Sequence, residues 1–237
     1  MIRGIKVFGL LCALLCLMPL KILPHPYARQ FSEECKRAFV FYDEHIDAIR
    51  KMANSLGVDA EFLFAIAVPE LTQFAYLRDK FETYSLKVLY VQGGTDYSNF
   101  SIGVFQMKPS FIQQMEDSLR MDEQLKLKFR HCLIDNPKTR KARVERVKRL
   151  EQLEWQINYL ALFYALVEKQ FANESFSDKQ NKLRFYASAY NTGFHKPVEI
   201  IKQMSQKALF PRFSFQKYCY GDISVWFYDK LIASANK

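Results

Sequence analysis

One carboxylate stands out as a residue that could do chemistry. Glu70 follows the run 62–68, which is apolar all round and too short to span a bilayer, as is typical of a helix inside a protein. Burial beside apolar groups raises the pKa of a Glu, so Glu70 is a candidate general acid that keeps its proton near neutral pH. Because Pro69 has no backbone N–H to donate, we expect the helix to end or kink just before Glu70.

Two short motifs with polar residues and glycines lie downstream of this carboxylate. The segment 100–109 is mostly apolar, and Gly103 and Gln106 interrupt it. The segment 187–193 contains Tyr190 and Asn191 and ends at a glycine. Each motif alone is short and has a real false-positive rate, so only the three pieces together point to a function.

These three pieces, in this order and over roughly residues 58 to 194, resemble the lysozyme-like lytic transglycosylases of the soluble-transglycosylase (SLT) type. The pattern of that family is an apolar helix ending in Glu, a Gly-Leu-Met-Gln-like loop and an Ala-Ala-Tyr-Asn-Ala-Gly helix end. The present chain has Leu71 where the family commonly has Ser, and Val104-Phe105 where the family loop has Leu-Met.

The resemblance implies a mainly α, lysozyme-like α+β domain with a small β or loop region beside the active-site cleft. It implies cleavage of the β-1,4 bond between N-acetylmuramic acid and N-acetylglucosamine in peptidoglycan glycan strands, with a 1,6-anhydro product and no cofactor or metal. Glu70 would act as general acid and then as base, and Tyr190 would hydrogen-bond Glu70. The substrate-binding residues would be Ser101, Gly103, Gln106 and Asn191.

Two other functions stay open. A lysozyme-type muramidase, which is a hydrolase, would use a second carboxylate, and Asp79, Glu82 and Asp96 are the candidates, although no spacing singles one out. A catalytically inactive glycan-binding envelope protein is the alternative from another class, and Leu71 in place of the family Ser makes it conceivable. The sequence does not determine endo or exo action, stem-peptide preference or protein partners.

The N-terminus has the charge order of an export signal. Arg3 and Lys6 precede an apolar run over residues 7–20, which predicts a signal peptide or membrane anchor over residues 1–28 and a single domain over 29–237. We therefore expect export to the periplasm or cell envelope, with membrane association possible through the N-terminal segment. Neither Cys12 nor Cys16 has a convincing lipidation context, because a bulky leucine precedes each.

The chain is basic, with a formal net charge of +9 that falls to +6 if residues 1–28 are removed, because three basic residues and no acids lie there. A basic exported protein is drawn to the anionic cell wall rather than to nucleic acid. Alternatively, the charge belongs to a solvated helix face. That face would carry Lys138, Arg140, Lys141, Arg143, Arg146, Lys148 and Arg149.

Cysteine and histidine usage limits two further possibilities. Three cysteines, Cys35, Cys132 and Cys219, follow the N-terminal segment, so one pair at most could form a disulfide, and the sequence does not choose it. The four histidines show no paired ligand spacing, which argues against a metal site.

The elements that must position these motifs are mainly helical. The patterns predict a helix over 42–56 capped by Gly57, a helix over 110–119 opened by Pro109, and a long amphipathic helix over 144–171. Short strands are expected over 96–106, after the break at Gly93-Gly94. The aromatic C-terminal extension, 213–231, is expected to form a strand or helix over the core.

Overall fold

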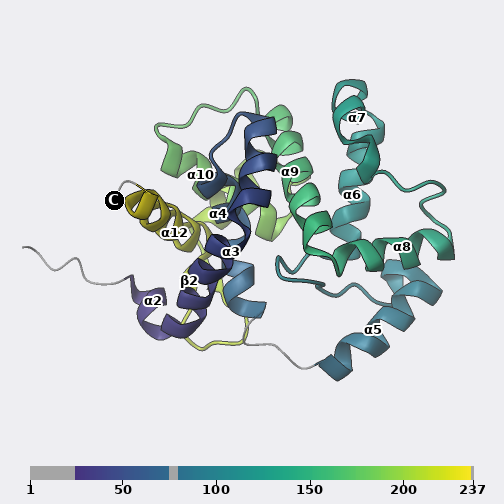
Figure 1. The fold of residues 1–237 in the computed structure, drawn as a ribbon, viewed down its shortest axis with the longest axis horizontal. Helices are drawn as coiled ribbons and strands as arrows, with labels where there is room; N and C mark the ends of the chain where they lie inside the picture. Colours follow the sequence, from purple (N-terminus) through teal and green to yellow (C-terminus); the bar gives the residue numbers. More distant parts are fainter. Residues whose placement is uncertain (1–24, 75–79, 236–237) are drawn as a thin grey trace, which may run out of the picture.

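The computed structural model describes the backbone of residues 25–74 and 80–235, and this part is mainly helical. Figure 1 shows α5, α6, α7 and α8 on one side and α2, α3, α4, α10 and α12 on the other, with α9 between them. The first group comprises α5 (Lys80–Gly93), α6 (Pro109–Arg120), α7 (Glu123–Phe129) and α8 (Arg140–Leu150). The second comprises α2 (Pro26–Gln30), α3 (Ser32–Leu56), α4 (Ala60–Phe74), α10 (Lys179–Thr192) and α12 (Tyr220–Ala235), and α9 spans Leu153–Gln170.

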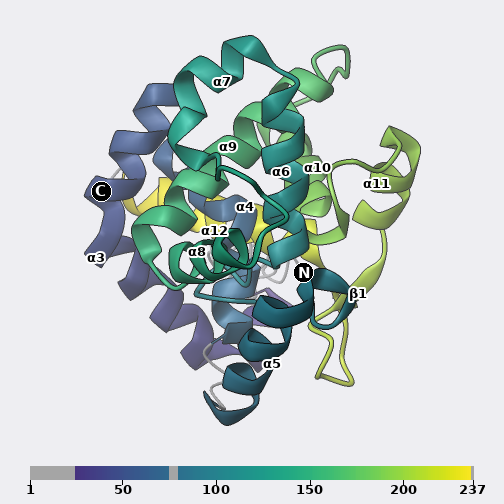
Figure 2. The same ribbon diagram turned by 90° about the vertical axis from the view of Figure 1, so that its right-hand side faces the viewer.

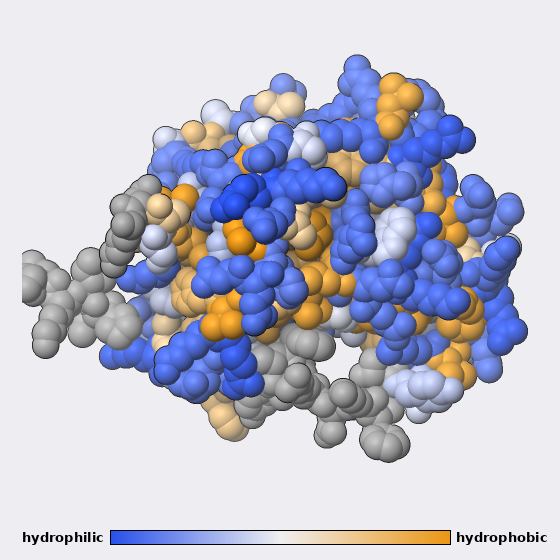
Figure 3. Space-filling model, in the orientation of Figure 1, coloured by the Kyte–Doolittle hydropathy of each residue, from blue (hydrophilic) through white to orange (hydrophobic). Residues whose placement is uncertain are grey.

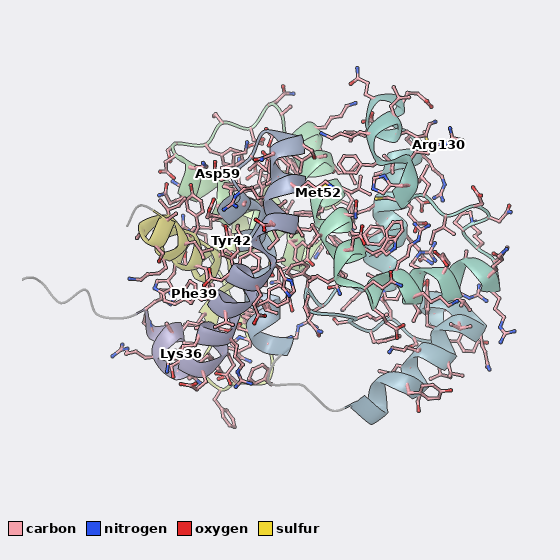
Figure 4. The ribbon with its side chains drawn as sticks, viewed as in Figure 1. Lys36, Phe39, Tyr42, Met52, Asp59 and Arg130 are labelled. Carbon is pink, nitrogen blue, oxygen red and sulfur yellow. The ribbon has the colours of Figure 1, made fainter. Side chains whose placement is uncertain are left out.

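The middle of the second group is α4. Every side chain over residues 62–68 is at most 2% exposed, because α3, α9, α10 and α12 all pack against this helix. This confirms that the apolar run is a buried helix. Phe39 and Tyr42 project from α3 toward its neighbours (Figure 4): Phe39 contacts Phe227 of α12, and Tyr42 contacts Phe64 of α4.

The helix does not end before Glu70, so the expected ending at Pro69 is wrong. Pro69 lies inside α4, which continues to Phe74. The Thr72 hydroxyl donates to the Pro69 carbonyl at 2.7 Å and also bonds the Tyr27 hydroxyl from α2. An interior proline costs a helix about 3 kcal/mol, and packing on all sides of α4 outweighs that cost.

The predicted long helix over 144–171 is two helices, α8 and α9, which break at Glu151 and Gln152. The Gln156 side chain donates to the carbonyl of Leu150 at 2.9 Å and so satisfies a group at the end of α8. Side-chain hydrogen bonds of this kind satisfy the free carbonyl groups at a helix end. The apolar spacing alone did not indicate the break between α8 and α9.

Strands over 96–106 were expected and are absent from this segment, which the structure describes completely. Residues 94–96 form the 3-10 helix η1 (Gly94–Asp96), and a single bridge joins Ile102 to Met107. The cause is positive φ at Gly103 (73°) and Gln106 (48°), which makes a tight turn in place of extended chain. A two-stranded antiparallel sheet lies instead at β1 (Ala208–Phe210) and β2 (Tyr218–Cys219).

Three local signals are confirmed. Gly57 follows α3 in the left-handed conformation with φ of 68°, and its N–H closes the helix. Pro109 is the first residue of α6. The C-terminal extension forms both a strand and a helix, because β2 leads into α12, and α12 packs on α4 and α10.

The N-terminal boundary expected after Ala28 falls inside α2. Tyr27 is 1% exposed and packs on Phe31 and Tyr218 at ring-centroid distances of 4.7 and 5.2 Å. The expected signal or anchor, residues 1–24, lies outside the described residues. Among the helices that are described, none alone is long and apolar enough to cross a membrane, and α3 and α4 pass that test only as a pair bent by 119°.

The basic segment before α9 is not simply a solvated face. Arg146 is fully buried, and its guanidinium makes two parallel hydrogen bonds to Glu116 of α6, at 3.1 and 2.8 Å. It also donates to the Tyr90 hydroxyl of α5 at 2.8 Å. Burial alone would lower the pKa of Arg146, but the hydrogen bonds and charge of Glu116 outweigh burial and raise it. Elsewhere, Figure 3 shows hydrophilic side chains over most of the face in view.

The three cysteines that could have paired are free thiols: Cys35 and Cys132 are buried, and Cys219 is partly exposed. Burial raises the pKa of Cys35 and of Cys132 to about 12, so both stay protonated.

Candidate active site

A cleft of about 310 Å³ opens beside Glu70. Its walls come from α4, from the loop before α6, from α6 itself, from the end of α10 and from the segment after β1. Figure 2 shows α6 and α8 in front of α4, with α11 (Val198–Ser205) and β1 at one edge. The cleft therefore gathers segments that are more than 100 residues apart in the sequence. The polar lining residues are Glu70, Gln73, Asn99, Ser101, Gln106, Lys108, Ser110, Gln114, Tyr190, Asn191, Thr192, His195 and Arg212.

Glu70 stands on α4 at the point where this buried helix reaches the cleft. Burial raises the pKa of Glu70 from 4.5 to about 8, while the charges of Arg212 and Lys108 lower it to a smaller extent. A carboxyl group with this pKa holds its proton at neutral pH and releases it just above. Its environment is therefore that of a general acid.

The loop that carries Gly103 and Gln106 is a tight turn fixed to the core. The Gln106 side chain donates to the Gly103 carbonyl at 2.8 Å, and the Gln156 side chain on α9 accepts from the Phe105 N–H at 2.9 Å. A Cβ atom on Gly103 would lie 1.9 Å from the Gln156 amide nitrogen, so only glycine fits. Gln106 lines the cleft, and Gly103 shapes the turn without being part of the lining.

Tyr190 fixes the same turn from the other side. Its hydroxyl donates to the Phe105 carbonyl at 2.8 Å, whereas the family resemblance had implied a bond to Glu70. Its ring packs edge-on against Phe111 and Phe163, with centroids 5.3 and 5.2 Å away. Burial and the nearby Glu70 charge both raise the pKa of Tyr190 well above its ordinary value, so the phenol stays neutral. Tyr190 thus positions the loop that faces Glu70.

The remaining predicted site residues also reach the cleft. Asn191 lies in the last turn of α10, and Gly193 ends that helix, with φ of 104° and its N–H bonded to the Ala189 carbonyl at 2.8 Å. A Cβ on Gly193 would come within 2.8 Å of the His195 ring. Ser101 lies at the start of the turn and also lines the cleft.

The sequence motifs did not indicate the residues behind Glu70. Tyr27 bonds Thr72, two residues along α4 from Glu70. Tyr220, the first residue of α12, is 4% exposed and stacks edge-on against Phe210 of the cleft wall. Its hydroxyl lies against the backbone of Glu70 but makes no well-aligned hydrogen bond to any described group. The density of aromatic residues in the C-terminal segment was the one sequence feature that involved Tyr220. It did not distinguish a residue beside Glu70 from an ordinary core residue.

A second carboxylate is not part of the described lining. Asp96, one of the three candidates, lies in η1 away from the cleft, while the side chains of Asp79 and Glu82 fall outside the described residues. Within the described ranges, no three His, Cys, Asp or Glu side chains gather where a metal ion could bind. The described lining therefore offers one protonated carboxyl group together with amides, hydroxyls, one imidazole and two cations.

Comparisons with family models, with curated proteins and with solved structures find no match to this chain.

Proposed function

We propose that this protein is a peptidoglycan lytic transglycosylase that acts on glycan strands with Glu70 as its acid and base. The observation that carries the proposal is the setting of Glu70, a carboxyl group with a pKa of about 8 in a cleft with amide and hydroxyl groups. The three-part sequence resemblance supports it, because five of its six predicted site residues line this one cleft. The sixth, Gly103, forms the turn beside it.

In the first step, Glu70 gives its proton to the glycosidic oxygen between N-acetylmuramic acid and N-acetylglucosamine. The bond from the anomeric carbon to that oxygen breaks, and the neighbouring N-acetyl group of the substrate stabilises the developing cation. A carboxyl group that is protonated at neutral pH can take this role without an acidic medium.

In the second step, the Glu70 carboxylate removes the proton from the C6 hydroxyl of the same muramic acid. The C6 oxygen then bonds the anomeric carbon, which closes the 1,6-anhydro ring and returns Glu70 to its starting protonation state. Because the nucleophile is held by the substrate itself, proximity replaces an activated water, and a second carboxylate is not needed. The described cleft lining, with Glu70 as its one carboxylate, favours this route over the hydrolytic one.

Such substrates lie outside the cytoplasm, so the proposal includes export to the periplasm or cell envelope through the N-terminal basic and apolar segment. The net positive charge would favour encounter with the anionic wall.

Wall cleavage by wild type and by Glu70→Gln tests the catalytic role. The amide is nearly isosteric and cannot protonate a leaving group, so we expect solubilisation of purified sacculi to be abolished while the variant stays folded by circular dichroism. The matched control is Glu154→Gln, which makes the same change in the first turn of α9, outside the cleft, and should leave wall cleavage intact. Full activity in the Glu70→Gln variant would refute an enzymatic role for this cleft.

A further inference from the structure

Two cations line the cleft beside Glu70, and no described group forms an ion pair with either of them. Lys108 immediately precedes α6, and Arg212 lies between β1 and β2, so they come from separate elements. Within the described part of the chain, neither side chain forms a hydrogen bond or an ion pair. Other cations of the described chain do form ion pairs, as Lys87 does with Glu151 and Arg184 with Asp222.

These cations oppose the task of the general acid. Each one lowers the pKa of Glu70, whereas an acid that must hold its proton gains from the opposite shift. A purely catalytic cleft would do better without them. Their position is therefore better explained by something that enters the cleft.

The charge balance of the cleft indicates what enters. With Glu70 protonated, Lys108 and Arg212 leave the described lining with a positive charge that no acidic side chain offsets. A guanidinium binds a carboxylate through two parallel hydrogen bonds, and an ammonium adds a compact point charge. An anionic group on the substrate would form ion pairs with both side chains.

We propose that Lys108 and Arg212 form a subsite for a carboxylate group of the glycan strand, next to the bond that is cleaved. This rests on the proposed function, and it adds that the site selects strands by their charge. Two sources could supply the carboxylate. In a strand that keeps its stem peptides, it is a peptide carboxylate; in a strand stripped of peptide, it is the free lactyl carboxylate of the muramic acid.

Binding of a carboxylate would also assist the chemistry. It neutralises the two cations that lower the pKa of Glu70, so this pKa is higher in the substrate complex than in the free protein. The alkaline limb of kcat should then lie above that of kcat/KM for carboxylate-bearing strands. The two limbs should coincide for uncharged strands.

Binding without turnover tests the subsite directly. In the Glu70→Gln background, calorimetry would compare three oligosaccharides of equal length: one with stem peptides, one stripped to free lactyl carboxylates, and one whose lactyl groups are converted to neutral methyl amides. We expect the neutral one to bind at least about tenfold more weakly than the better of the other two. Lys108→Gln and Arg212→Gln, added singly, should shrink this difference, and raising the salt concentration should do the same.

Lys207→Gln is the matched control, because Lys207 is exposed just before β1, carries the same charge and does not line the cleft. It should leave the preference intact. Equal binding of all three strands, or a preference that survives both cleft substitutions, would overturn the subsite while leaving wall cleavage by the wild type in place. Whichever charged strand binds more tightly identifies the source of the carboxylate.

Discussion

At the scale of single residues, the environment of Glu70 decides what the cleft can do. Burial holds the pKa of this carboxyl group near 8, and the opposing charges of Arg212 and Lys108 are weaker than burial. The folded protein therefore binds this proton more tightly than the unfolded chain, in which the pKa has its ordinary value of 4.5. Stability and catalysis should both register the same titration.

The first prediction concerns stability against pH. Because the folded pKa is raised, the stabilisation from this proton is complete below pH 4.5 and is lost as pH rises through 8. Glu70→Gln is neutral at every pH and lacks this loss, which should be on the order of a few kcal/mol. Between about pH 5 and about pH 9, the melting temperature should fall further for wild type than for Glu70→Gln. Equal drops would mean that Glu70 is an ordinary exposed carboxylate.

A second prediction separates positioning from packing at Tyr190. Tyr190→Phe removes the hydrogen bond to the buried Phe105 carbonyl, which should cost about 1 to 3 kcal/mol of stability and loosen the turn that faces Glu70. Turnover on sacculi should fall, with a smaller change in KM, because the loop that lines the cleft loses its fixed geometry. Tyr84→Phe, at an exposed position on α5, is the control. Lower melting with unchanged turnover would leave Tyr190 a purely structural residue.

At the scale of elements, a buried ion pair joins α6 and α8 on the side of α9 that faces away from α4. Arg146 of α8 bonds Glu116 of α6 and the Tyr90 hydroxyl of α5, and both charged side chains are 0% exposed. The start of α6 also lines the cleft. The pair therefore fixes one wall of the cleft relative to α8.

The third prediction concerns that pair. Glu116→Gln leaves the Arg146 charge buried without a counter-ion and should cost about 3 to 5 kcal/mol in urea denaturation. Replacing both partners, Glu116→Leu with Arg146→Met, should cost less than the single change. Breaking the exposed Arg50 to Asp47 pair should cost under about 1 kcal/mol. A double variant that is less stable than the single one would contradict this interpretation.

The same elements show which features sequence patterns can predict. Gly57, Pro109 and Gly193 act through their own backbone preferences, so their local signals sufficed. Pro69 does not end α4, because packing around this helix outweighs the local penalty of the proline.

The candidate site divides in the same way. Ser101, Gln106, Tyr190 and Asn191 belong to motifs that the resemblance identified, and they meet Glu70 in one cleft. Gln156 and Tyr220 act through partners far away in the sequence, and a single glutamine or tyrosine carries no motif that would reveal this. The Arg146 pair went unrecognised for the same reason, because its spacing matches an exposed helix face.

At the scale of the whole molecule, the segment before α3 belongs to the folded body. Tyr27 is buried against Phe31 and Tyr218, and its hydroxyl bonds Thr72 on the helix that carries Glu70. A chain cut after Ala28 would lose these contacts. The site and the N-terminal region are thus coupled through α2.

A fourth prediction follows for shortened chains. A chain beginning at His25 should keep wild-type melting, whereas one beginning at Arg29 should lose about 3 to 5 kcal/mol, the cost of deleting a buried aromatic side chain, and should lose activity with it. Tyr27→Ala in the full chain should reproduce most of that loss. Equal melting of the two shortened chains would show that α2 contributes nothing to the fold.

The measurement that tests the central claim most directly is mass spectrometry of the fragments released from intact sacculi. A transglycosylase without a second acid should yield 1,6-anhydromuramic ends, and this activity should survive Asp79→Asn, Glu82→Gln and Asp96→Asn made singly. Release of reducing muramic ends alone, with one of those three variants folded but inactive, would contradict the transglycosylase and establish a lysozyme-type hydrolase in its place.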